Sequence, residues 1–318
     1  MKQEKFGFIR LDGSYLIEPV FDNAFDFSEG LALVETEGKY GYIDTSGEYA
    51  IKPQYEWASV FNDGEARVRI GDFFYNIDKY GKTLGEGFSE PFNVLRKGHL
   101  GRALSSTESK LAKENEGREI IVYPSKSDFS CCLGRYEYWK SFESGPKFGF
   151  MDENMQIVIT AKFSEVEKFS EGLAAVSNRG KWRYINTKGV YAFKGFFDDA
   201  WGFKEAVARV KFNNKWGYID KEGKFIIKPQ YKSASDFSEG LAFVRKSNRA
   251  LYFYINLNNE DVFDKLFSLV RPFSDGVAFA GTKGKFGLIN KEGEYIVEPV
   301  FDYCEEFKEG FAVVSIKK

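Results

Sequence analysis

A nine-residue phrase returns at regular intervals along this chain. The letters KYGYIDTSG at 39–47 return as KWGYIDKEG at 215–223 and as KFGLINKEG at 285–293. The turn residue that closes the phrase recurs every 34 to 38 residues, at Gly13, Gly47, Gly81, Gly117, Met155, Gly189, Gly223, Asn259 and Gly293. About nine registers of one unit therefore fill the 318 residues, as in repeat architectures whose units pack on their neighbours.

Each repeat is predicted to fold into a three-stranded β-meander. Tyr40–Ile43 is a short aromatic strand, and the turn that follows places Asp44 to accept backbone bonds and Gly47 at positive φ. Residues 49–51 return as a second strand, which Pro53 is predicted to end because it has no N–H. A Phe-Ser-Glu-Gly corner then opens the third strand. The 18% aromatic content and the 31 glycines suit short strands and tight turns.

The sequence predicts an all-β fold with the repeats in a single array over residues 1–318. The chain starts on a first strand at 5–9 and stops on a third strand at 311–316, and pairing these two would remove two exposed edges. We therefore expect a propeller-like ring. An open β-solenoid or superhelix is the alternative, because nine registers exceed the usual range of about 4–8 blades. An irregular insertion or degenerate repeat is expected at about residues 84–146.

The most complete copy of the repeat has Trp216 and Gly217 in the setting KWGYID, followed by Pro-Gln-Tyr at 229–231 and by FSEGLA at 237–242. This combination resembles the WG-repeat (KWG-repeat) family of bacterial proteins, over nearly the whole chain except about residues 85–115. The resemblance implies an all-β repeat and a bacterial origin. It implies no particular activity, because the family has no common reaction. Trp182 departs from the pattern, since an arginine follows it.

Composition excludes several classes of function. Lys and Arg number 45 against 47 Asp and Glu, so the chain as a whole has no basic excess of the kind that binds a phosphate backbone, and no nucleic-acid partner is expected. No apolar run of about 18 residues is present, so no membrane span is expected. No signal peptide is recognised either, which favours a cytoplasmic location. Cys131, Cys132 and Cys304 make no disulfide framework, and the only histidine is His99.

Two acidic positions recur, and both have a structural interpretation. The first is interpreted as an Asx turn rather than a metal site, because Asn replaces Asp freely at Asp12, Asp44, Asp78, Asp152, Asp220, Asn186, Asn256 and Asn290. The second is the corner glutamate at Glu29, Glu171, Glu239 and Glu309. Repeat-equivalent glutamates share one environment, whereas an acid and a nucleophile need different ones. No catalytic residue, metal site or cofactor is predicted.

Two groups of residues are candidate binding residues. The first lies on the irregular stretch 84–118, which is either a projecting recognition loop or a decayed repeat, and comprises Arg96, Lys97, His99 and Arg102. The second comprises the tryptophans outside the repeat position, Trp57, Trp139 and Trp201, which could stack on a sugar or anchor a protein if exposed. The adjacent Cys131 and Cys132 have the wrong spacing for zinc and are interpreted as buried.

These observations predict a non-enzymatic binding or scaffold protein that recognises a macromolecular partner, namely another protein, through the loops of its array. Glycan binding at a cell surface or cell wall through exposed aromatic residues is the alternative. A hydrolase with carboxylates at the centre of a ring is a third interpretation. If the insertion is the recognition element, deletion of residues 86–115 should abolish partner binding and leave the fold intact.

Overall fold

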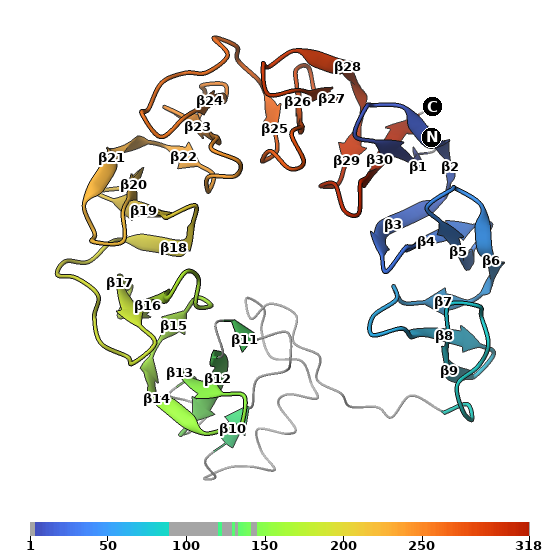
Figure 1. Cartoon of the computed structure of the whole chain (residues 1–318), viewed down its shortest axis with the longest axis horizontal. Coiled ribbons are helices and arrows are strands. Elements are labelled where there is room, and N and C mark those ends of the chain that lie inside the picture. Colours follow the sequence, from blue (N-terminus) through green and yellow to red (C-terminus); the bar gives the residue numbers. More distant parts are fainter. Residues whose placement is uncertain (1–3, 89–119, 123–128, 131–132, 141–144, 318) are drawn as a thin grey trace. The chain divides into compact units, whose positions relative to one another are not determined.

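The structure is a computed structural model that describes residues 4–88, 120–122, 129–130, 133–140 and 145–317. These residues form β-strands and turns, with eight antiparallel sheets among them (Figure 1). The chain divides into two compact units. Unit 1 comprises residues 1–96 and 263–318, and unit 2 comprises residues 97–262. The predicted all-β repeat fold is confirmed.

Unit 1 holds four sheets, with the strand orders β3-β4-β5-β6, β7-β8-β9, β25-β26-β27-β28 and β2-β1-β30-β29. Their bounds are β1 Glu4–Arg10, β2 Tyr15–Phe21, β3 Asn23–Ser28, β4 Leu31–Thr36, β5 Lys39–Asp44, β6 Tyr49–Tyr55, β7 Trp57–Ala58, β8 Ala66–Ile70, β9 Phe73–Ile77, β25 Leu269–Val270, β26 Ala278–Gly281, β27 Phe286–Ile289, β28 Tyr295–Phe301, β29 Tyr303–Cys304 and β30 Phe311–Lys317.

Unit 2 holds the other four sheets, β10-β12-β13-β14 with β11 also on β12, β15-β16-β17, β18-β19-β20-β21 and β22-β23-β24. Their bounds are β10 Ile120–Val122, β11 Phe129–Ser130, β12 Leu133–Trp139, β13 Lys147–Asp152, β14 Ile157–Phe163, β15 Glu165–Val166, β16 Leu173–Asn178, β17 Lys181–Asn186, β18 Asp199–Lys204, β19 Val207–Phe212, β20 Lys215–Ile219, β21 Phe225–Tyr231, β22 Ser233–Ala234, β23 Ala242–Arg245 and β24 Phe253–Ile255.

The predicted Asx turns are confirmed. Asp44 Oδ1 accepts the N–H of Ser46 at 2.8 Å and that of Glu48 at 3.1 Å, while Gly47 has φ 92°. The bond from the residue two positions on recurs at Asp12, Asp78, Asp152, Asn186, Asn256 and Asn290. Asp220 accepts the N–H of Lys224. A single short acceptor therefore holds each turn, which is why Asp and Asn are interchangeable there.

The corner Phe-Ser-Glu-Gly is a two-residue hairpin turn. Glu29 and Gly30 have φ values of 56° and 85°, and Ser28 pairs with Leu31 across them. Two consecutive residues with positive φ make a type I′ turn, whose twist matches that of the flanking strands. The corner therefore joins the third strand to a short strand before it, such as β3 or β7, which the sequence did not predict.

The prediction that Pro53 ends the second strand is wrong. β6 continues through Pro53 to Tyr55, and the register passes from Tyr42↔Ile51 to Tyr40↔Tyr55, so the strand bulges around the proline. β6 is an edge strand, where a missing N–H costs no ladder bond. The chain then crosses at once into the next sheet, so that each repeat contributes to two sheets.

The first and last described strands pair, as the sequence predicted. β1 and β30 are antiparallel neighbours from Glu4↔Lys317 to Arg10↔Phe311, inside the sheet β2-β1-β30-β29. Glu4 accepts a bond from the Ser315 hydroxyl at 2.6 Å and faces the Lys317 ammonium at 3.6 Å. The ring and the open superhelix both stay predictions.

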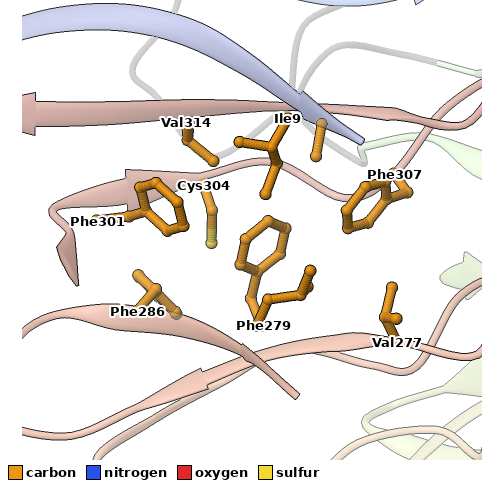
Figure 2. Close-up of a cluster of buried hydrophobic side chains, with 10 residues drawn as sticks. Ile9, Val277, Phe279, Phe286, Phe301, Cys304, Phe307 and Val314 are labelled. Atoms are coloured by element: carbon orange, nitrogen blue, oxygen red, sulfur yellow. The ribbon is translucent and has the colours of Figure 1, made fainter. Parts of the chain in front are cut away.

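Buried side chains between neighbouring sheets form the core. In unit 1 the ring of Phe279 packs among Phe301, Phe307, Ile9 and Cys304, which come from two adjacent sheets (Figure 2). Phe279 stacks on Phe307 with ring centroids 5.5 Å apart. Cys304 is fully buried and free, and burial raises the pKa of its thiol to about 12. It therefore behaves as a small apolar residue.

Candidate functional site

The structure separates the predicted binding residues into two groups. Arg96, Lys97, His99 and Arg102 lie outside the described residues, as do Cys131 and Cys132 and nearly all of residues 86–115. Trp57 on β7 of unit 1 and Trp201 on β18 of unit 2 are 41% and 42% exposed. Trp139 on β12 is half-buried. Trp57 and Trp201 therefore qualify as exposed aromatic residues.

The corner glutamates connect one repeat to the next. The Glu309 carboxylate accepts the N–H groups of Glu29 and Gly30 at 2.8 and 2.9 Å, and the Glu29 carboxylate accepts that of Gly64 at 3.0 Å. Equivalent bonds run from the corners that follow to Glu171 and Glu205. The structural interpretation of the corner glutamate is confirmed at Glu29, Glu171 and Glu309.

The carboxylate of Glu171 allows the contribution of these bonds between repeats to be tested. A hydrogen bond from Lys221, whose ammonium is 2.9 Å away, is the main reason why the pKa of Glu171 is lowered. Its stabilising contribution is therefore complete at neutral pH and is lost as the pH falls through that lowered pKa. We expect Glu171→Gln to lower the free energy of unfolding by about 1 kcal/mol at pH 7.

Urea denaturation at neutral and at acidic pH checks this expectation. The difference between wild type and Glu171→Gln should shrink towards zero as the wild-type carboxylate becomes protonated. Glu222→Gln, on the exposed turn that follows β20, is the control and should change stability little at either pH. A difference that does not depend on pH would contradict the assignment.

The edge strand β18 bulges beside Trp201. Ala200 pairs with Val210 and Phe203 with Ala208, so Trp201 and Gly202 together lie opposite Arg209. An extra residue at a bulge redirects a side chain and often occurs at sheet edges. Here it turns the Trp201 indole out of the core, between the buried residues Ala200 and Phe203.

The residue at this bulge differs from repeat to repeat. We call it the bulge position, two residues before the corner phenylalanine; it is occupied by Phe25, Ser59, Glu167, Trp201, Ser235, Arg271 and Glu305. In five of these repeats its N–H makes the same bond to the third strand, as from Ser59 to Arg67 O at 2.9 Å and from Glu167 to Ala175 O at 2.8 Å. The backbone therefore repeats while the outward chemistry changes. Trp201 and Phe25 are its exposed aromatic residues.

The guanidinium of Arg209 lies between the rings of Trp201 and Trp216. The Arg209 guanidinium carbon lies 4.7 Å from the Trp201 ring centroid and 4.9 Å from that of Trp216. Arg209 Nε is 3.1 Å from Asp236 Oδ1, and the guanidinium also donates to the Ala234 carbonyl. Cation–π contacts with tryptophan are the strongest of their kind. The cluster thus fixes the exposed indole on a rigid, charged base.

Carboxylates surround this cluster. Burial raises the pKa of Glu167, the Arg135 charge opposes that rise, and the Asp199, Asp236 and Glu165 charges add to it. Burial is the main cause of this rise, and the neighbouring carboxylates add to it. The surroundings of Trp201 therefore combine an indole with several carboxylates. We call Trp201, Arg209, Glu165, Glu167, Asp199 and Asp236 the Trp201 site.

Sequence reasoning identified Trp201 but missed Arg209 and the carboxylates. Superposing the repeats on the corner phenylalanine would have exposed the variable bulge position. It would not have placed Arg209 opposite Trp201, because the bulge sets that register. In the described parts of the chain, no group of His, Cys, Asp or Glu is placed to hold a metal ion. Nor do the described residues include a helix long and apolar enough to cross a membrane.

Trp57 has different neighbours from Trp201. Its ring makes an edge contact with Phe74, with ring centroids 5.8 Å apart, and it lies opposite Arg69 on β8. Glu56 beside it pairs with Arg69 at 3.3 Å. Among the described residues, no guanidinium or ammonium group stacks on the Trp57 ring. It offers an exposed indole without the charged base of the Trp201 site.

Comparison with solved structures gives only distant likenesses. Hsv2p of Kluyveromyces lactis is 10% identical, with a TM-score of 0.36 over 84% of this chain and 91% of that one. A eukaryotic initiation factor is 12% identical, with a TM-score of 0.40 over 96% and 87%. PorZ, a surface component of the type-IX secretion system of Porphyromonas gingivalis, is 10% identical, with a TM-score of 0.32 over 87% and 38%. These TM-scores are too low to carry an argument about this chain.

Comparison by sequence is decisive for the family. None of the curated proteins matches the chain. A family model described as a WG containing repeat matches seven times, at residues 6–40, 40–72, 148–182, 182–216, 216–249, 252–286 and 286–318. The matches include the strand, Asx turn, bulged strand and corner described above. The chain belongs to the family of proteins built from WG-containing repeats.

Proposed function

We propose that this chain is a non-enzymatic binding or scaffold protein, and that unit 2 recognises a protein partner at the Trp201 site. The observation that carries this proposal is the exposure of Trp201 at the bulge position, where the chemistry varies although the backbone repeats. In a repeat protein, positions that vary on a constant frame are free to serve recognition. Tryptophan and arginine are also the residues that contribute most to binding at protein interfaces.

The use of the other recurrent polar residues supports a binding role over an enzymatic one. The aspartates of the turns bond the backbone two residues on, and the glutamates of the corners bond the next repeat. Groups engaged in this way keep fixed partners and fixed charges. A catalytic carboxylate must instead face a substrate.

The test is a comparison of partners retained from a lysate of the source organism. We expect the immobilised full chain to retain a protein, and Trp201→Ala to lower the amount retained about tenfold or more, because the loss of a central aromatic anchor costs about 2 kcal/mol. Leu251→Ala is the matched control, since Leu251 belongs to the same unit and is also 42% exposed. Equal retention by all three proteins would refute the proposal.

Glycan binding is the second candidate, and the exposure of both Trp57 and Trp201 favours it. An indole that stacks on a sugar loses its contact with water, so its fluorescence should shift to shorter wavelength. We expect this shift with soluble cell-wall fragments only if the glycan candidate is correct. Trp57→Phe and Trp201→Phe would then show which ring carries it. Unchanged fluorescence across such fragments would count against glycan binding.

A further inference from the structure

We propose that the partner segment that docks at the Trp201 site is basic, and that one of its arginine or lysine side chains stacks on the exposed part of the Trp201 indole. This inference rests on the proposed function and adds the chemistry of the partner to it. Three features of unit 2 support it, namely an unpaired strand edge, a ring that already binds a cation, and a set of carboxylates that outnumber the cations beside them.

The docking surface is the free edge of β18. β18 is the first strand of the order β18-β19-β20-β21, so in the described part of unit 2 only β19 pairs with it. Figure 1 shows it at the border of its sheet. Ala200 is buried, whereas Trp201 is exposed and Asp199 is half-buried, with its Oδ1 accepting the Ala200 N–H at 2.9 Å. An aromatic ring and a carboxylate are thus presented together along one strand.

The Trp201 ring is already a cation-binding surface. Arg209 lies over it at 4.7 Å, within the distance of about 6 Å at which cations are attracted to an aromatic face. The guanidinium is fixed there by Asp236 and by the Ala234 carbonyl, so it stays in place when a partner arrives. The exposed remainder of the indole is open to a second cation, and Asp236 reduces the repulsion that this cation would meet from Arg209.

The charges near Trp201 favour a positive partner. Arg209 neutralises Asp236 at 3.1 Å, and Arg135 is the cation that acts most strongly on Glu167. Lys211 is the cross-strand neighbour of Asp199, and its ammonium lies 5.7 Å from the Trp216 ring. Glu165 is exposed, and its charge, like that of Asp199, still raises the pKa of Glu167. The site therefore has four carboxylates, Glu165, Glu167, Asp199 and Asp236, against three cations, Arg135, Arg209 and Lys211, and these groups together carry an excess of one negative charge.

This combination selects between classes of partner. A nucleic acid would bring phosphates against these carboxylates, and like charges repel. A purely apolar segment would cover carboxylates without pairing them, which costs desolvation energy. A basic segment pairs with them and places a cation over the ring. It is the partner whose charge complements the surface.

The experiment uses the full-length chain and two short fluorescein-labelled Gly-Ser peptides, one with arginines and one with glutamates, in fluorescence anisotropy. We expect the arginine peptide to bind more tightly than the glutamate peptide and to weaken as salt is raised. Trp201→Ala should weaken its binding about tenfold, and Asp199→Asn about threefold. Glu222→Gln, on an exposed turn of the same unit, should leave it unchanged.

Circular dichroism verifies that each variant is folded. If Trp201→Ala does not fold, the binding of the arginine peptide to Asp199→Asn tests the inference. Equal binding of the two peptides, or arginine-peptide binding that neither variant weakens, overturns the inference. The proposed function then stands if Trp201→Ala still loses a protein in the lysate comparison. If that comparison also shows no difference, both proposals fail.

Discussion

Replacing Gly217 by alanine is expected to lower the free energy of unfolding by about 3 kcal/mol. A Cβ at this position would lie 2.5 Å from the Ile227 carbonyl oxygen and 2.7 Å from the Pro229 nitrogen. Both are backbone atoms of β21, where the strand bulges around the proline, so no side-chain rotation relieves the clash. The glycine after the repeat aromatic residue therefore exists to let this bulge close over it.

Urea denaturation measures the effect, and Gly202→Ala is the matched control. Gly202 has no positive φ, and the nearest atom to its added Cβ is the Ser170 Cβ at 3.5 Å, an ordinary contact. Its stability should therefore change by less than about 0.5 kcal/mol. The same approach to backbone recurs at Gly7, Gly41, Gly149 and Gly287. Equal stability of the Gly217 and Gly202 variants would refute the steric explanation.

Local chemistry made the turns predictable. An Asp or Asn three residues before the turn glycine defines its own bonds, because donor and acceptor lie within a few residues, as at Asp44 and Ser46. The same local reasoning gave the wrong prediction that Pro53 ends the second strand. Proline blocks a ladder bond only where the strand has a neighbour on that side, and β6 is an edge strand that bulges there.

Several of the unpredicted strands carry very little sequence signal. β7, β15 and β22 have two residues each, which is too short for an alternation of apolar and polar residues to appear. Their pairing is fixed instead by the corner that follows and by the carboxylate of the neighbouring repeat, as in the bonds from Glu29 and Gly30 to Glu309. The other bonds of this kind join residues one repeat apart, and the period does not show which backbone groups a carboxylate meets.

The candidate site was predictable in part for the same reason. Trp201 was recognisable because it lies outside the repeat position of tryptophan. Arg209 was not, since a one-residue change in register would turn it to the other face of the sheet. The bulge that places Trp201 and Gly202 opposite Arg209 sets this register, and with it the face on which Arg209 lies. Recognition residues on a repeat frame are thus found by departure from the repeat, while their partners require the fold.

The largest effect is expected from ending the chain at residue 310, which removes β30. This strand pairs with β1 over residues 311–317 and carries buried side chains on both faces. Val313 belongs to the cluster around Phe8, and Val314 to the cluster around Phe279. Each buried valine contributes about 1.5–3 kcal/mol, and the lost backbone ladder adds to this. The sum is comparable to the whole stability of a small domain, about 5–15 kcal/mol.

Hydrogen exchange locates the damage. In the shortened chain the amides of β1 and β2 should lose their protection, since β1 then has one neighbouring strand and two opened cores. A chain that ends at Lys317 keeps the whole of β30 and should match the wild type. Unit 2 provides the internal reference, because Ile185 and Val210 belong to cores that β30 does not touch. Protection of β1 that survives the truncation would show that the pairing of the first and last strands does not hold unit 1 together.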